Sequence, residues 1–154
     1  MNDRLKVLNE SPPPRRWYEE GLRFQCTECG QCCTGSPGYT WVSEEEIITM
    51  AAKLNLELEE FGRRYLRQIG QKFALLERPD TYDCVFLEGQ RCKVYDVRPT
   101  QCRTFPYWPS VLESRDAWRT TGTYCEGIDH PEAPLIELSE IEQQRRLQES
   151  AETE

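Results

Sequence analysis

Histidine is nearly absent from this sequence: His130 is the only one among 154 residues. As a lone residue before Pro131, it is expected to be an exposed loop residue rather than a metal ligand. The sequence also lacks the GxxxxGK(S/T), GxGxxG and HExxH motifs that bind nucleotides or a catalytic zinc ion. No apolar run approaches the roughly 20 residues that span a bilayer, so no membrane partner is expected.

Basic residues are outnumbered by acidic ones, 19 Lys and Arg against 27 Asp and Glu, which leaves a net charge of −8. Because binding to nucleic acid depends on basic surface that contacts phosphates, no nucleic-acid partner is expected. The N-terminus has no apolar stretch followed by a small-residue cleavage site, so we expect a cytoplasmic location. In that reducing compartment, clustered cysteines are expected to bind metal rather than to form disulfides.

Cysteine, in contrast, is abundant. The stretch CTECGQCC places four cysteines within residues 26–33, and four more follow. A catalytic thiol needs one cysteine beside a base, and a disulfide needs two, so neither explains four in one short segment. Eight thiols are enough for two tetrahedral metal sites or for two clusters. The candidate metal ligands are Cys26, Cys29, Cys32, Cys33, Cys84, Cys92, Cys102 and Cys125.

The first cysteine segment has the spacing of a metal-binding turn. Two residues separate Cys26 from Cys29, which lets both sulfur atoms reach one metal ion. Gly30 follows and can adopt the positive φ that turns backbone N–H groups toward a sulfur atom. Including Cys32 gives C-x2-C-x2-C, the run that ligates a cluster in bacterial ferredoxins, but the Cys-Pro that ends that motif is absent. The pattern argues against a ferredoxin-like fold and leaves an iron–sulfur cluster open.

Cys32 and Cys33 are adjacent, and neighbouring side chains on an extended backbone point to opposite faces. The two thiols are therefore expected to point in different directions. One interpretation sends Cys32 to the metal of the CTEC turn and Cys33 to a neighbouring site. The alternative is that one of the two is a buried bystander thiol. The predicted groups are Cys26, Cys29 and Cys32 in one, and Cys33, Cys84 and Cys92 in the other, with Cys102 and Cys125 completing them in an order left open.

Periodicity and capping signals place these cysteines among short helices and strands. Ser43 followed by Glu46 is a capping box, which predicts the start of a helix. Apolar spacing predicts a second helix over residues 58–69. The other predicted elements are strands over 22–26, 39–43 and 72–77, a hairpin over 84–99 that can bring Cys84 and Cys92 together, a short helix after Pro99, and a polar surface helix capped by Ser139 and Glu142.

The predicted fold class is α+β: one small domain with short strands and two to three helices around a cysteine-rich metal-binding core. A chain of 154 residues fits one domain, since single domains hold about 100–200 residues. The predicted organisation is a flexible N-terminal arm over residues 1–20, a metal-binding domain over 21–130 and a polar helical C-terminal tail over 131–154.

The segment 95–106, YDVRPTQCRTFP, is the most distinctive stretch outside the cysteines themselves. In a structural interpretation, Arg98 pairs with a carboxylate, Pro99 starts a helix and Phe105 enters the core. In a functional interpretation, Arg98 and Arg103 border a metal site, where they bind an anion or tune the charge of the site. The structural interpretation is the favoured one.

Taken together, CTECGQCC, CVFLEGQRCKVYDVRPTQCRTFP and CEG resemble the YkgJ-like CxxCxxCC family, whose description names the chelation of zinc or iron. The matching segment covers roughly residues 22–128, and all eight cysteines fit the pattern of the family. The resemblance implies a metal site of cysteine thiolates. The same domain is associated with a flagellin lysine N-methylase, but this chain has no motif for a methyl donor, so that activity is not carried over.

The leading hypothesis is a metal-binding protein that holds zinc or iron through clustered cysteine thiolates. Zinc would act as a structural staple, whereas an iron–sulfur cluster would transfer electrons or sense redox state. One alternative is a metal-dependent enzyme of redox or methyl-transfer type, which requires an open metal position. Another is a metal-stapled protein-interaction module, in which the aromatic residues of FPYWPS (105–110) are exposed to a protein partner. Packing over the metal loops explains these residues equally well. The substrate, the partner and the oligomeric state stay open.

Overall fold

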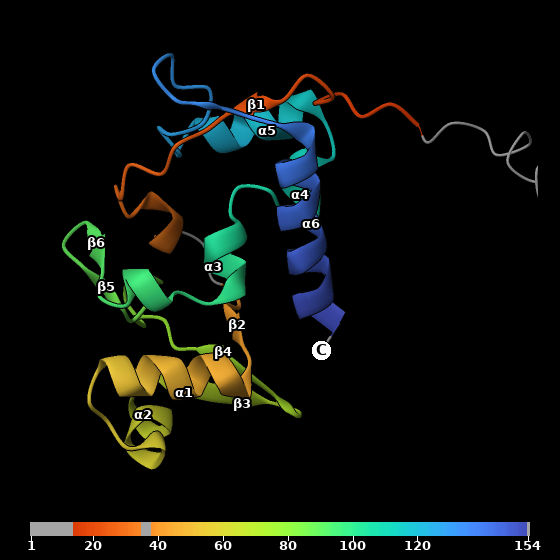
Figure 1. Cartoon of the computed structure of the whole chain (residues 1–154). Helices are drawn as coiled ribbons and strands as arrows, with labels where there is room; N and C mark the ends of the chain where they lie inside the picture. Colours follow the sequence, from red (N-terminus) through yellow and green to blue (C-terminus); the bar gives the residue numbers. More distant parts are fainter. Residues whose placement is uncertain (1–13, 35–37, 154) are drawn as a thin grey trace, which may run out of the picture.

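The computed structural model describes residues 14–34 and 38–153, and it has the predicted α+β class (Figure 1). It contains more helices than the two or three predicted. The α-helices are α1 (Glu44–Lys53), α2 (Leu58–Tyr65), α3 (Thr100–Thr104), α4 (Pro109–Leu112), α5 (Arg115–Gly122) and α6 (Leu138–Thr153), and the 3-10 turns are η3 (Gln31–Cys33) and η4 (Tyr95–Val97). The strands are β1 (Leu22–Arg23), β2 (Trp41–Val42), β3 (Leu66–Ile69), β4 (Lys72–Leu75), β5 (Leu87–Glu88), β6 (Arg91–Cys92) and β7 (Leu135–Ile136).

Helix α1 begins as its sequence predicts. The Ser43 hydroxyl accepts a hydrogen bond from the Glu46 backbone N–H at 3.2 Å, and the Glu46 carboxylate accepts one from the Ser43 N–H at 2.9 Å. This reciprocal arrangement is a capping box, and it satisfies N–H groups that have no partner inside the helix. Three acidic residues in the first turn also complement the positive end of the helix dipole. The apolar face of α1 buries Ile47, Met50 and Ala51.

The helix predicted over residues 58–69 is wrong in its second half. Helix α2 ends at Tyr65, and the next four residues form β3, which pairs antiparallel with β4. Gly70 makes the turn between these two strands with a φ of 63°. Strand β4 also pairs with β2, so the sheet order is β2-β4-β3. Pairing with β4, which is itself held by the distant strand β2, overrides the local helical spacing of Leu66 and Ile69.

The apolar side chains gather in two clusters, one at each end of the molecule (Figure 1). The first, called the α1–β4 cluster below, packs helices α1 and α2 against the three-stranded sheet. The second, called the α4–α6 cluster, packs α4, α5 and α6 against the N-terminal segment. The α1–β4 cluster consists of Val42, Ile47, Met50, Ala51, Phe61, Leu75, Phe86 and Val94, and the α4–α6 cluster of Tyr18, Leu22, Tyr107, Val111, Leu112, Trp118, Ile128 and Ile141.

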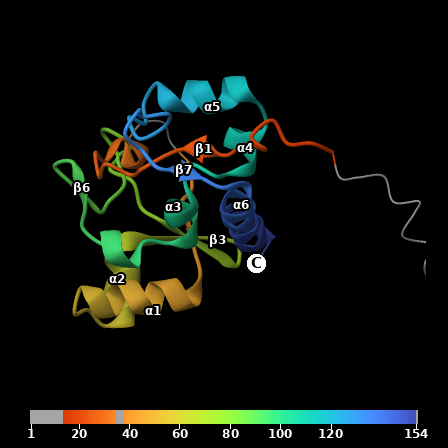
Figure 2. The same ribbon diagram turned by 45° about the horizontal axis from the view of Figure 1, so that its top comes forward.

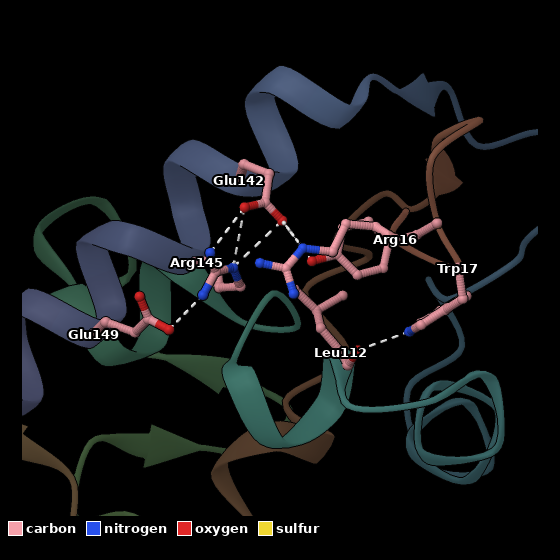
Figure 3. A network of polar contacts seen from close by, with 7 residues as sticks. Arg16, Trp17, Leu112, Glu142, Arg145 and Glu149 are labelled. Carbon is pink, nitrogen blue, oxygen red and sulfur yellow. Dashed lines mark hydrogen bonds and ion pairs between the residues drawn. The ribbon is translucent and has the colours of Figure 1, made fainter. Parts of the chain in front are cut away.

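The α4–α6 cluster joins the two ends of the described chain. Strand β1 pairs antiparallel with β7, with Leu22 opposite Ile136, and the two strands lie side by side in Figure 2. Just before β1, the Trp17 indole N–H donates a hydrogen bond of 2.7 Å to the Leu112 carbonyl (Figure 3). The Tyr18 hydroxyl donates one of 2.5 Å to Glu142 on α6. Residues 1–13 of the predicted arm lie outside the described part.

Helix α6 starts two residues earlier than predicted: a cap at Ser139 would make Glu140 the first helical residue, but Leu138 is already helical, so Ser139 is not the cap. The helix is held to the body by more than surface contacts, since Ile141 and Gln148 are fully buried. Gln148 accepts a hydrogen bond of 3.0 Å from the Thr104 hydroxyl on α3. On the side of α6 that faces the N-terminal segment, Arg145 forms ion pairs with Glu142 and Glu149 (Figure 3).

Two further predictions concern the middle of the chain. The hairpin is confirmed, with β5 and β6 joined at Gly89 and Gln90. The helix after Pro99 is confirmed as α3. Helix α5 was not predicted: Ser114 caps it by accepting a hydrogen bond from the Ala117 N–H at 3.0 Å. Its apolar anchor is a single large residue, Trp118, which gives little periodic signal.

Candidate metal centre

The CTECGQCC segment forms a tight loop that leaves β1 and ends in η3. Two of its residues have a left-handed backbone, Glu28 with φ 56° and Gly30 with φ 76°. The positive φ expected of Gly30 is therefore confirmed, and it begins the η3 turn that carries both Cys32 and Cys33. A glycine is needed there for a second reason as well. A Cβ atom at position 30 would lie 2.3 Å from the backbone oxygen of Gln90.

Backbone contacts hold this loop from both sides. At its start, the Gln25 N–H donates to the Gly127 carbonyl at 3.2 Å, next to Cys125. At its end, the Cys84 N–H donates to the Cys33 carbonyl at 2.7 Å. Three segments that are far apart in the sequence are thereby brought together, and each of them carries cysteine.

All eight cysteines line one cavity of about 310 Å³. All eight are free thiols; Cys26 and Cys32 are exposed, and the other six are partly buried. The cavity lies where the two apolar clusters approach each other, because Phe24 packs on the α4–α6 cluster whereas Phe86 belongs to the α1–β4 cluster, and both contribute to its wall. A larger cavity of about 430 Å³ lies beside α1 and α6, but no cysteine lines it.

Cys33 lies between two other thiols and forms side-chain hydrogen bonds with both. Its hydrogen bonding lowers the pKa of Cys32 to about 7, and it lowers the pKa of Cys92 to about 7 in the same way. The pKa of Cys33 itself is raised, first by these hydrogen bonds and then by burial. The hydrogen bonds to Cys33 thus favour the thiolate forms of Cys32 and Cys92 and disfavour that of Cys33. Thiolates are the form of cysteine that binds metal.

The remaining cysteines are less easily ionised. Burial raises the pKa of Cys84 to about 11, and it also raises the pKa values of Cys102 and Cys125. Charge interactions with Cys29 and Cys32 also raise the pKa of Cys125, which indicates that Cys125 lies near the first loop. For Cys84, the thiols whose charges raise its pKa are Cys92 and Cys32. A metal ion would shift these equilibria, because binding requires deprotonated sulfur and releases protons.

Two side chains of the 95–106 segment extend into the same cavity. Tyr95 and Arg98 both line it, as does the exposed Arg103. A hydrogen bond with the Cys26 side chain, followed by burial, raises the pKa of Tyr95 to about 12. The Arg98 guanidinium lies 3.9 Å above the centre of the Tyr95 ring. The favoured structural interpretation of Arg98 is wrong, because its position is at the cysteines and no carboxylate within residues 14–34 and 38–153 forms an ion pair with it.

Other candidate residues lie elsewhere. His130 is exposed, as expected, and its Nδ1 accepts a hydrogen bond from the Glu132 N–H at 3.1 Å. The aromatic residues of FPYWPS are not an exposed surface, which corrects that prediction. Tyr107 is only 6% exposed, and the Trp108 indole donates to the Gln101 carbonyl at 2.8 Å. The apolar wall of the cavity was not predicted either: Phe24, Leu75, Phe86 and Val94 carry no sequence signal that distinguishes them from ordinary core residues.

The donor set fits a thiophilic metal. Soft thiolate sulfur binds zinc and iron–sulfur clusters, and the loop supplies sulfur from several backbone segments at once. In the part of the chain that the structure describes, no three His, Cys, Asp or Glu side chains already surround a common point as ligands would. Side-chain rotation would be needed to complete a coordination sphere, and the exposed positions of Cys26 and Cys32 give two of the thiols room for it.

A small α+β domain whose thiols gather from several segments in one cavity belongs to the class of cysteine-rich metal-chelating domains. Comparison with known families agrees: residues 25–126 match the CxxCxxCC family, described as "Putative zinc- or iron-chelating domain". The chain belongs to this family, which confirms the resemblance seen in its sequence.

A curated relative from Methanocaldococcus jannaschii, "Uncharacterized protein MJ0661", is 29% identical over 118 residues. The similarity covers 72% of this chain and 61% of that protein, so the chain spans about three-fifths of the length of the relative. No solved structure matches this chain. Among the helices of the described residues, none has the length and hydropathy needed to cross a membrane.

Proposed function

We propose that this protein binds zinc or iron through the thiolates of Cys26, Cys29, Cys32, Cys33, Cys84, Cys92, Cys102 and Cys125. The observation that carries the proposal is the convergence of all eight cysteines on one cavity. Cys125 packs against the α4–α6 cluster and Cys84 and Cys92 against the α1–β4 cluster, yet all of them line the same cavity between the clusters. Bound zinc would act as a staple between segments, whereas an iron–sulfur cluster would supply electron transfer.

The division of the cysteines into two groups remains part of the proposal. Cys33 hydrogen-bonds both to Cys32, assigned to the first group, and to Cys92, assigned to the second. That contact supports two neighbouring centres, or one larger cluster, in preference to two distant ones. The place of Cys125 was left open by the sequence, and its charge interactions with Cys29 and Cys32 support placing it in the first group.

The first experiment is elemental analysis together with an absorption spectrum, on protein purified without oxygen. Brown protein that contains iron and sulfide would identify a cluster, and colourless protein with zinc would identify a structural site. The proposal predicts that Cys26→Ser and Cys29→Ser lower the metal content, whereas His130→Ala, a change at an exposed residue outside the cavity, leaves it unchanged. Wild-type protein without metal, or the same metal content in both cysteine variants, would refute it.

Single and double substitutions resolve the grouping. With two separate centres, Cys29→Ser and Cys92→Ser should each remove part of the metal, and the double variant should remove all of it. With one shared cluster, either single substitution should remove the whole cluster. Metal content measured side by side for the three variants separates these two forms of the proposal.

A metal-dependent enzyme is the second candidate, and one observation favours it. Tyr95, Arg98 and Arg103 line the cavity together with the cysteines, and groups of these types bind and orient substrates. Such an enzyme needs an open position on its metal. Exogenous azide or cyanide that changes the spectrum of the cobalt-substituted protein would support an open position, and an unchanged spectrum would support a closed, structural site.

A further inference from the structure

Tyr95 and Arg98 contact each other at the wall of the cysteine cavity and hold each other in place. They lie three residues apart, at the start of η4 and directly after it. The Arg98 guanidinium stacks 3.9 Å above the Tyr95 ring, and its Nε–H donates to the Tyr95 carbonyl at 3.0 Å. The next residue, Pro99, is fully buried, which fixes the chain on the other side. These contacts fix the positions of the Tyr95 hydroxyl and of the remaining N–H groups of Arg98.

The charge of Arg98 needs a partner. Its side chain is partly buried, and a charge removed from water is normally paired. Within the described residues no carboxylate forms an ion pair with it, as noted above. Of the two acidic residues that line the cavity, Asp96 is engaged with Lys53 at 2.6 Å, and Glu28 is exposed.

The groups that Arg98 does face are thiols. Arg98 lines the same cavity as Cys32, Cys92 and Cys102, which come from the first loop, the hairpin and helix α3. One cation thus lies on a wall shared by all three of these cysteine-bearing segments. The other two arginines of the cavity wall differ, because Arg91 and Arg103 are exposed, and Arg103 donates to the Thr100 hydroxyl at 3.0 Å.

Four thiolates around one divalent ion carry a net charge of about −2. In metal sites, groups behind the ligands offset such charge and orient the ligands. Building on the function proposed above, we propose that Tyr95 and Arg98 are the outer-shell pair of the metal centre. The Tyr95 hydroxyl donates a hydrogen bond to the Cys26 thiolate, and Arg98 supplies the positive charge that offsets the thiolates. Both are positioning residues that act on the metal through its ligands.

The charge part of this proposal is tested by zinc affinity. Zn²⁺ is titrated against a chromophoric chelator in reducing, oxygen-free buffer, with wild type, R98Q, R98K and R103Q. R98Q should raise the Kd about 10–100-fold, the usual effect of losing an outer-shell partner. R98K keeps the charge and should retain most of the affinity. R103Q is the matched control: it removes the same charge from the same wall, but at an exposed position. Its small effect should disappear near 1 M salt, where the screening length is about 3 Å.

The hydrogen-bond part is tested by the spectrum of the Co²⁺-substituted protein. Without a donor from Tyr95, the Cys26 sulfur holds its electrons less tightly, so Y95F should move the sulfur-to-cobalt charge-transfer band to lower energy. Y82F is the control, because Tyr82 is 47% exposed and does not line the cavity. Loss of packing alone would not shift this band.

The outcomes distinguish a failure of the proposed metal binding from a failure of the role assigned to Tyr95 and Arg98. A wild-type protein that binds neither Zn²⁺ nor Co²⁺ overturns the proposed function, and this inference with it. If the wild type binds normally, three results overturn the outer-shell pair alone. These are an affinity of R98Q equal to that of R103Q, an affinity of R98K as weak as that of R98Q, and an unshifted charge-transfer band in Y95F. Circular dichroism verifies the fold of each variant. If R98Q fails to fold, Y95F against Y82F still decides, since this substitution removes only the hydroxyl and keeps the ring.

Discussion

Gly30→Ala tests the close contact between the first cysteine loop and the β5–β6 hairpin. An added Cβ would lie 2.3 Å from the Gln90 oxygen and 2.9 Å from the Gln90 carbonyl carbon, whereas real Cβ atoms stay beyond 3.0 Å. The loop and the hairpin must therefore separate by at least about 0.7 Å. Such overpacking costs about 1–3 kcal/mol. The left-handed backbone, φ 76°, adds about 1–2 kcal/mol for a residue with a side chain. The expected loss in the free energy of unfolding is about 2–5 kcal/mol.

Gly89→Ala is the matched control, because Gly89 lies in the same hairpin and has φ 62° but no neighbouring atom within 4 Å of its added Cβ. It should lose only the backbone part, about 1–2 kcal/mol. Urea unfolding followed by tryptophan fluorescence, in reducing buffer without oxygen, measures both variants. If Gly30→Ala is no more destabilising than Gly89→Ala, the two segments do not touch as the structure describes, and the wall of the cavity is built differently.

Other substitutions test the cap, the core and the ion pairs. Ile141→Ala empties a fully buried site in the α4–α6 cluster and should cost about 2–5 kcal/mol in thermal unfolding, whereas Leu147→Ala, at a site 47% exposed on the same helix, should stay within about 0.5 kcal/mol. Ser43→Ala removes half of the capping box and should cost about 1 kcal/mol by urea midpoint; no loss would contradict the cap. Arg145 holds the pKa of Glu142 below its ordinary value, so this carboxylate contributes stability above that ordinary pKa and loses it as the pH falls through the lowered one. Glu142→Gln should therefore flatten the acid decline of Tm, and an unchanged decline would show that the pair contributes nothing.

The elements predicted correctly from the sequence are those whose causes are local. The cap of α1 needs only Ser43 and Glu46, three residues apart, and the turn after the CTEC motif needs only Gly30. The strand β3 was missed because its residues are spaced like a helix, and that spacing outweighed the signal of the turn at Gly70. The pairing that fixes the sheet, between β4 and the distant strand β2, is not visible in any short window of the sequence.

The same distinction applies to the site. The eight cysteines can be read directly from the sequence, whereas their common cavity depends on contacts between distant segments, such as Gln25 with Gly127. From the sequence, the aromatic residues of FPYWPS fit exposure to a partner and packing over the metal loops equally well. Tyr107 is buried because Trp118 stacks on it from α5, a helix whose few apolar residues give little signal in the sequence. Arg98 was assigned to a carboxylate because nothing local shows which groups surround it.

The order in which the cavity wall is synthesised has a consequence inside the cell. The first four thiols have been synthesised by residue 33, and Cys125 follows 92 residues later. At about 5–20 residues per second, that interval lasts about 5–20 s. The Cys26–Cys33 loop first lacks the hairpin, and until the end of this interval it lacks the Gly127 carbonyl that holds it in the finished protein. Under the proposed function, the nascent chain thus carries four thiols without their later partners, and loading with the right metal would depend on the redox state and metal pools around the ribosome.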